Sequence, residues 1–163
     1  VGIVPEERNG HAAIPSMSLS NNALLTNHSL GKTIQHGVID DAATKEMAAE
    51  VITKFDVRVP SDDPIAASLS GGNLQKFVVG REIIKSPRLL VVAQPTWGVD
   101  VGAAVSIRNS MLELAASGSA VIMISQDLEE VLAKLLLIPG LDLHNWGEPL
   151  QDLKRFFQVF KRR

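Results

Sequence analysis

The chain has 163 residues and a mass of 17.6 kDa, which is the size of one domain. Sixteen basic and 18 acidic side chains give a net charge of −2, so no overall positive field draws the chain to nucleic acid or to an acidic membrane. The absence of cysteine excludes disulfides and thiolate metal sites, and 45% apolar with 21% charged residues is the composition of a globular protein.

The first eight residues have neither a basic start nor a long apolar core, so we expect no signal peptide there. The longest apolar runs are far shorter than the roughly 20 residues that span a bilayer. The chain does not begin with Met and opens on strand-like residues. We therefore expect it to be part of a longer protein.

Apolar residues at helical spacing predict four helices. Asp40 or Asp41 is placed to cap the first of them. Pro87 stops the second helix, because the residue before a proline avoids the helical region, and Gly118 suits the carboxyl end of the third. The predicted helices cover residues 40–55, 72–85, 103–117 and 127–135.

Residues 89–93 and 120–124 are short, continuously apolar runs, which predict strands of a parallel sheet with both faces covered. The helix predicted over 103–117 lies between them and completes a strand–helix–strand unit with a right-handed crossover. Such sheets bind ligands at the carboxyl ends of their strands, which here are followed by Gln94 and Gln126. The fold class is therefore α/β, although two strands make a small sheet for a chain of this length.

The sharpest motif is residues 69–76, Leu-Ser-Gly-Gly-Asn-Leu-Gln-Lys, at the start of the second predicted helix. A helix start leaves backbone N–H groups unpaired and exposes the positive end of the helix dipole. Gly71 and Gly72 allow another surface to approach closely, and Ser70 adds a hydroxyl donor. This arrangement is typical of a phosphate site. The same residues also fit an ordinary serine-capped helix after a glycine-rich turn.

Residues 87–100, Pro-Arg-Leu-Leu-Val-Val-Ala-Gln-Pro-Thr-Trp-Gly-Val-Asp, follow that helix. Together with residues 69–76 they resemble the nucleotide-binding domain of an ATP-binding cassette (ABC) transporter. Residues 69–76 resemble the family signature in the form found in importers of simple sugars and nucleosides. Residues 89–94 resemble the Walker B strand, and residues 98–100 resemble the D-loop.

Further matches lie on both sides of these motifs. Residues 4–8, Val-Pro-Glu-Glu-Arg, resemble the "VPEDR" segment of the second cassette in this subfamily, which places Glu6 at the Q-loop position. Residues 21–25 resemble the family's "ENxLL" helix start, and Gln126 falls where the switch histidine is expected. The resemblance runs from the first residue to about Leu132. It implies a truncated P-loop NTPase-type domain, with a helical subdomain and part of a parallel sheet.

Three parts of the family's hydrolytic machinery are absent or altered. The phosphate loop Gly-x-x-x-x-Gly-Lys-Ser/Thr does not occur, so we expect the chain alone to bind ATP weakly at best. Ala93 offers no oxygen to Mg²⁺ where the family carries Asp, and Gln94 cannot accept a proton from the attacking water. Ala93 and Gln94 also fit a plain strand end followed by a turn. Gln126 can donate to a phosphate but cannot become cationic.

The resemblance implies an asymmetric pair, in which the signature of this chain completes the ATP site of a partner cassette. ATP and Mg²⁺ would be held mainly by that partner, and transmembrane permease subunits would be the other partners, at the cytoplasmic face of the membrane. No nucleic acid is expected. The degenerate catalytic positions are Gln94 and Gln126, and the residues expected at the nucleotide are Ser70, Gly71, Gly72, Asn73, Gln75, Asp100 and Glu6.

Two other functions stay open for the sequence. One is a non-catalytic module that only clamps a partner's nucleotide, and the other is a non-functional remnant of a gene. Asp100 can be a helix N-cap, a D-loop bridge, or both. The four histidines lack ligand spacing, so no metal site is expected.

The expected division of the chain follows the motifs. It comprises a remnant of the core strand and Q-loop region, a helical subdomain with the signature, a partial catalytic core, and a divergent tail. The tail carries apolar residues at helical spacing beside basic ones, which predicts a basic amphipathic helix. The boundaries are residues 1–13, 14–87, 88–134 and 135–163.

Overall fold

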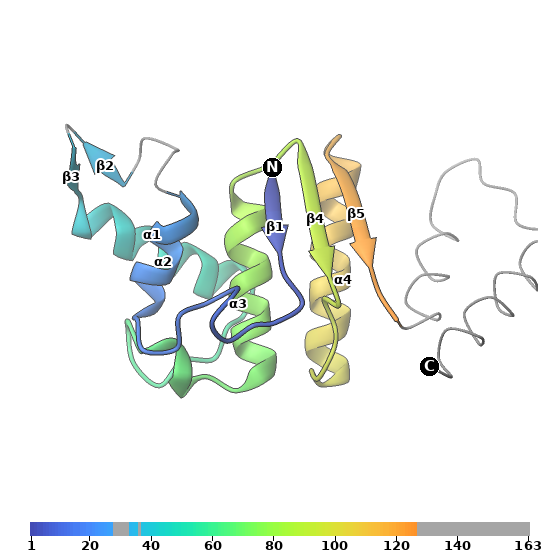
Figure 1. Cartoon of the computed structure of the whole chain (residues 1–163), viewed down its shortest axis with the longest axis horizontal. Helices are drawn as coiled ribbons and strands as arrows, with labels where there is room; N and C mark the ends of the chain where they lie inside the picture. The colour runs from blue at the N-terminus through green and yellow to red at the C-terminus, as the bar shows by residue number, and fades with distance from the viewer. Residues whose placement is uncertain (28–32, 36, 127–163) are drawn as a thin grey trace, which may run out of the picture. The chain divides into compact units, whose positions relative to one another are not determined.

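The computed structural model describes residues 1–27, 33–35 and 37–126, so the predicted helix over 127–135 and the tail lie outside the described residues. The chain divides into two units, Val1–Ile122 and Met123–Arg163. The elements, shown in Figure 1, are β1 (Gly2–Val4), α1 (Leu19–Asn27), β2 (Ile34–Gln35), β3 (Val38–Ile39), α2 (Asp41–Lys54), the short 3-10 helix η2 (Ala66–Ser68), α3 (Gly71–Ile84), β4 (Leu89–Ala93), α4 (Val101–Ala116) and β5 (Ala120–Ile124).

β1, β4 and β5 form a three-stranded sheet, with β4 in the middle (Figure 1). β1 runs parallel to β4, with Gly2 opposite Leu90 and Val4 opposite Val92. The two predicted strands occupy the residues expected, and β1 joins them from the start of the chain. The buried side chains of Val4, Leu90 and Val92 face the helical side, where α3 contacts both β1 and α4.

The expectation that both faces of the sheet are covered is wrong for the described part of the chain. β4 alternates between half-buried and buried residues, and β5 alternates between exposed and half-buried ones. Ile3 is 60% exposed and Ile122 is 51% exposed. A continuously apolar run indicates that both faces of a strand avoid water, but it does not show which residues cover them.

The helix caps follow the sequence closely. Asp40 caps α2, because its side chain accepts the N–H of Ala43 at 3.0 Å. Asp100 caps α4 in the same way through Ala103 at 2.9 Å, so this helix begins two residues before the predicted range. Gly118, just beyond the end of α4, has a φ of +96°, the left-handed conformation that favours glycine at this position.

α1 and the β2–β3 hairpin are elements that hydrophobic periodicity did not predict. The buried side chain of Asn22 organises the entry to α1: its amide donates to the carbonyls of Ile14, Met17 and Ser18, and its oxygen accepts the N–H of Ile14 at 2.7 Å. The N–H of Leu19 then donates to the carbonyl of Pro64. The bonds of Asn22 are polar and local and the bond to Pro64 joins distant segments, and an apolar pattern signals neither.

A buried charged cluster on α3 ties that helix to the segments before it. The side chains of Arg81 and Glu82 are 1% and 2% exposed, and Arg81 Nε donates to Glu82 Oε1 at 3.1 Å. The two other guanidinium nitrogens of Arg81 donate to the carbonyls of Ala12 and Asn22, both at 2.9 Å. Lys85 pairs with the second oxygen of Glu82. Burial lowers the pKa of Arg81 and of Lys85, and Glu82 partly opposes this effect.

Candidate functional site

The serine–glycine turn lies at the surface. Ser70 is the N-cap of α3, with φ −62° and ψ 155°, and α3 begins at Gly71, one residue before the predicted start. Ser70 and Gly71 are exposed and Gly72 is half-buried. The N–H groups of the first helical turn have no partner within a helix, so those of Gly71 and Gly72 are directed away from α3 at this surface.

The hydroxyl of Ser70 is held by Asn73 as an acceptor. Its Oγ accepts the side-chain amide of Asn73 at 2.9 Å and the backbone N–H of Asn73 at 3.4 Å. The amide oxygen of Asn73 accepts the N–H of Arg58, which fixes the amide's orientation. A hydroxyl has two acceptor positions and one donor hydrogen. Since Asn73 is the donor in both bonds, neither uses the hydroxyl hydrogen of Ser70, which can therefore be donated to a ligand.

Asp100 and Gly72 bring the starts of α4 and α3 together. A Cβ added at Gly72 would lie 3.2 Å from Oδ2 of Asp100, so glycine permits this close approach. Hydrogen bonding to the Ala103 N–H lowers the pKa of Asp100, and Lys76 also favours the carboxylate. An open pocket of about 390 Å³ lies here, lined by Asp56, Arg58, Gly72, Asn73, Lys76, Asp100, Gly102, Ala103 and Ser106.

The lowered pKa of Asp100 predicts a pH-dependent contribution to stability. The contribution is present above the carboxyl's unfolded-state pKa and is lost as the pH falls through the lower folded-state pKa. We expect Asp100→Ala to lower the melting temperature at pH 7 and to do so less at about pH 2.

Asp100→Asn keeps a capping oxygen but cannot titrate, so its melting temperature should depend less on pH over the same range than that of the wild-type chain. Melting curves at several pH values test this. A cost of Asp100→Ala that stays constant down to about pH 2 would contradict the assignment.

Arg8 joins the site, and sequence reasoning missed it. Its Nη1 donates to the carbonyl of Gly71 at 2.9 Å, and its Nη2 donates to the carbonyl of Trp97 at 3.1 Å. Gly98, the next residue, has a φ of +64°. The available signal was that Arg8 lies in the same motif as Glu6, but the sequence could not show which segments its guanidinium would join.

The other residues predicted at the nucleotide differ in burial and in the unit to which they belong. The side chain of Gln75 is buried at 1% exposure, and its Oε1 has no hydrogen-bond partner among the described residues. Glu6 is exposed on the segment after β1. Gln126 is the last described residue and belongs to the second unit, whereas the signature lies in the first.

Ala93 and Gln94 lie at the carboxyl end of β4, as predicted. Gln94 is 9% exposed and has a φ of +49°, a left-handed conformation that is uncommon for residues other than glycine. Such strained positions cluster at functional sites. The methyl group of Ala93 supplies no ligand atom to a cation.

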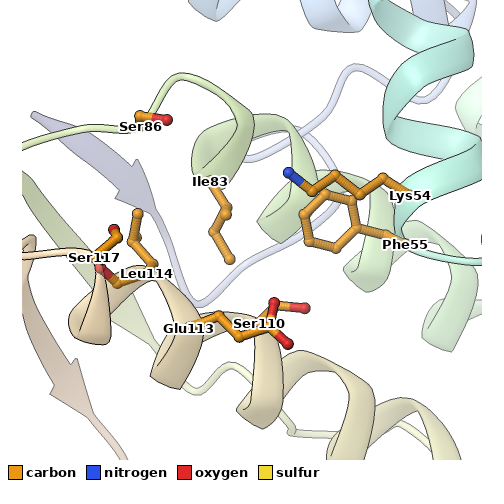
Figure 2. A pocket seen from close by; sticks show the side chains of 8 residues that line it. All are labelled: Lys54, Phe55, Ile83, Ser86, Ser110, Glu113, Leu114 and Ser117. Carbon is orange, nitrogen blue, oxygen red and sulfur yellow. Dashed lines mark hydrogen bonds between the residues drawn. The ribbon is translucent and has the colours of Figure 1, made fainter.

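A second pocket, of about 260 Å³, lies among α2, α3 and α4 and is separate from the signature turn. Figure 2 shows Phe55 and Ile83 directed into it. Its lining is Lys54, Phe55, Ile83, Ser86, Ser110, Glu113, Leu114 and Ser117. Among the residues that the structure describes, no helix is long and apolar enough to cross a membrane.

The sequence of the chain is similar to those of import ATP-binding proteins. The chain is 36% identical over 132 residues to the guanosine import ATP-binding protein NupO of Bacillus subtilis, a match that covers 81% of the chain and 26% of NupO. It is 39% identical over 132 residues to the xylose import ATP-binding protein XylG of Photobacterium profundum, with the same coverages. No protein-family model matches the sequence.

Solved structures show the same fold. The dimeric ABC transporter cassette MJ0796 aligns with a TM-score of 0.64 at 19% identity, over 80% of this chain and 53% of that one. The ABC transporter cassette MJ1267 aligns with a TM-score of 0.57 at 26% identity, over the same shares. The chain spans about a quarter of the length of its curated relatives. It belongs to the ATP-binding cassette family, and it corresponds to part of a nucleotide-binding domain like those of sugar and nucleoside importers.

Proposed function

We propose that this chain supplies the signature side of an ATP site whose phosphate loop belongs to a partner cassette. The observation that carries the proposal is the exposed turn at Ser70, whose hydroxyl accepts both bonds from Asn73 and keeps its donor hydrogen available. The free N–H groups of Gly71 and Gly72 add donors at the positive end of the α3 dipole. A terminal phosphate fits this set of donors. Bound ATP would supply the negative charge that draws the two cassettes together.

We further propose that the chain's own hydrolytic site is degenerate. Mg²⁺ requires oxygen ligands, and Ala93 has none at the strand end where one is needed. Gln94 is a neutral amide and can orient a water molecule without taking its proton. The residues at this strand end therefore do not fit the cation, whereas those of the signature fit a phosphate. This difference favours the module that clamps a partner's nucleotide over a complete ATPase.

The proposed assembly is a membrane importer for sugars or nucleosides, with this chain on the cytoplasmic side. The relatives that carry import names support this assignment. In it, residues 14–87 form the helical subdomain that meets the permease, and residues 88–134 contribute to the catalytic core. Gln75 would act in such a site only through packing, because its side chain is buried.

Nucleotide-dependent association tests the proposal. The chain is mixed with a cassette that has an intact phosphate loop, and their dissociation constant is measured by analytical ultracentrifugation with and without a non-hydrolysable ATP analogue. Association should require the analogue. Ser70→Arg should weaken it by about tenfold or more, since it removes the hydroxyl donor and obstructs the turn.

The matched control is Ser16→Arg, which makes the same change at an exposed serine outside the signature. It should leave the dissociation constant unchanged. Association that is independent of the analogue, or equal weakening by both variants, would show that Ser70 does not clamp a phosphate.

A further inference from the structure

Arg8 bonds two turns that are remote from it and from each other in the sequence. The Gly71 carbonyl lies in the first turn of α3, 63 residues along the chain, and the Trp97 carbonyl lies in the turn before α4, 89 residues along. The two turns also lie close together, since a Cβ added at Gly71 would lie 3.7 Å from the Gly98 carbonyl oxygen. One planar guanidinium therefore joins the signature turn to the turn that leads into the D-loop.

The packing around the guanidinium explains two of the glycines in the motifs. A Cβ added at Gly71 would lie 2.9 Å from Nη1 of Arg8, and one added at Gly98 would lie 2.8 Å from Nη2. At Gly98 the positive φ disfavours side chains as well. Both glycines therefore leave the space that the Arg8 side chain occupies, and the three residues depend on one another.

Arg8 is itself firmly attached to the rest of the chain. Its carbonyl accepts the N–H groups of Ala12 and Ala13, at 3.1 and 2.8 Å. The carbonyl of Ala12 is held in turn by the buried guanidinium of Arg81. On the other side, Val4 is paired with Val92 in the sheet, four residues before Arg8. The backbone of Arg8 is therefore held by bonds on both sides of the residue.

We infer that Arg8 is a positioning residue, which makes the placement of the signature turn and of the turn before α4 depend on the segment after β1. Glu6 lies on that segment and is exposed, so a contact made there is linked through Arg8 to the donors at Ser70 and Gly71. The effect of Arg8 on nucleotide clamping rests on the proposed function. Arg8 acts through the two carbonyls and needs no contact with the nucleotide.

Hydrogen exchange of two amides measures the positioning without any nucleotide. The Leu74 N–H closes the signature turn on the Ser70 carbonyl, and the Trp97 N–H closes the other turn on the Gln94 carbonyl. In Arg8→Ala, both amides should exchange faster by on the order of fivefold, because each turn loses a charge-assisted hydrogen bond. Arg8→Lys should restore protection only in part, since a lysine lacks the planar fork that reaches both carbonyls.

The control is Arg88→Ala, which removes the same charge from an exposed arginine outside this cluster. It should leave both exchange rates within about twofold of the wild-type values. Equal rates in Arg8→Ala and Arg88→Ala at both amides would overturn the positioning role. Wild-type protection of both amides in Arg8→Lys would overturn the requirement for a bidentate side chain.

The association assay with an intact cassette tests the functional consequence. Arg8→Ala should weaken nucleotide-dependent association by about threefold or more, and Arg88→Ala should not. Faster exchange with unchanged association would overturn the link to clamping. If the wild-type chain fails to associate at all, the proposed function fails, while the exchange rates still decide whether Arg8 positions the turns.

Discussion

Replacing Glu82 with alanine is expected to lower the free energy of unfolding by about 3–5 kcal/mol. The change leaves the guanidinium of Arg81 buried without its anionic partner, at 1% exposure. It also removes the partner of Lys85. Two desolvated cations without a counter-ion cost more than the ion pair itself contributes, which is why removing one partner of a buried pair is so unfavourable.

Urea denaturation at pH 7, followed by circular dichroism, measures this effect. Glu113→Ala is the matched control, because Glu113 is exposed on α4 and takes no part in the buried cluster. The control should change stability by less than about 0.5 kcal/mol. Similar losses in both variants would mean that the Arg81–Glu82 cluster does not hold α3 to the preceding segments.

Gly80→Ala is expected to destabilise the chain by about 1–3 kcal/mol, even though alanine is the better helix former. A Cβ added at Gly80 would lie 2.5 Å from Cδ2 and 2.6 Å from Cγ of Phe55. Phe55 is 4% exposed and is the C-cap residue of α2, and Figure 2 shows its ring directed into the pocket that Ile83 also lines. Rotation of the ring about its Cβ–Cγ bond does not move Cγ, so relief of the contact requires a change of χ1 or a shift of the backbone.

A double-mutant cycle with Phe55→Ala isolates that contact. In the Phe55→Ala background, Gly80→Ala should be neutral or stabilising by up to about 1 kcal/mol, because the ring is gone and only helix propensity remains. The free energies come from urea denaturation of the four proteins. If Gly80→Ala lowers the free energy of unfolding equally in both backgrounds, the Phe55 ring is not the cause.

In the proposed function, the serine–glycine turn binds a phosphate, whereas the end of β4 at Ala93 does not bind Mg²⁺. These two regions lie on consecutive elements of one chain, α3 and β4. In a head-to-tail pair they would belong to different ATP sites, so the loss of one need not impair the other. In the proposed pair, Arg8 would act on the site that the chain completes, through its bonds to Gly71 and Trp97.

The sequence by itself determined the strands and helix caps that depend only on residues close together in the chain. Residues 89–93 and 120–124 are strands with the predicted bounds, because short apolar runs end abruptly at polar neighbours. Asp40 and Asp100 cap their helices because a carboxylate three residues before a free N–H satisfies it without help from elsewhere. The signature was recognisable for the same reason, since the cap and both glycines are adjacent in the chain.

Only the tertiary structure decided the features that join distant segments. Arg8 bonds residues 63 and 89 positions away, and the N–H of Leu19 at the start of α1 donates to the carbonyl of Pro64. Gln75 is buried although its position in the signature indicated a ligand contact. In the described part of the chain, one face of the sheet carries exposed residues although its strands are apolar throughout. The sequence pattern indicates which side chains avoid water and which polar groups need a hydrogen-bond partner. The tertiary structure determines which partner each of them contacts.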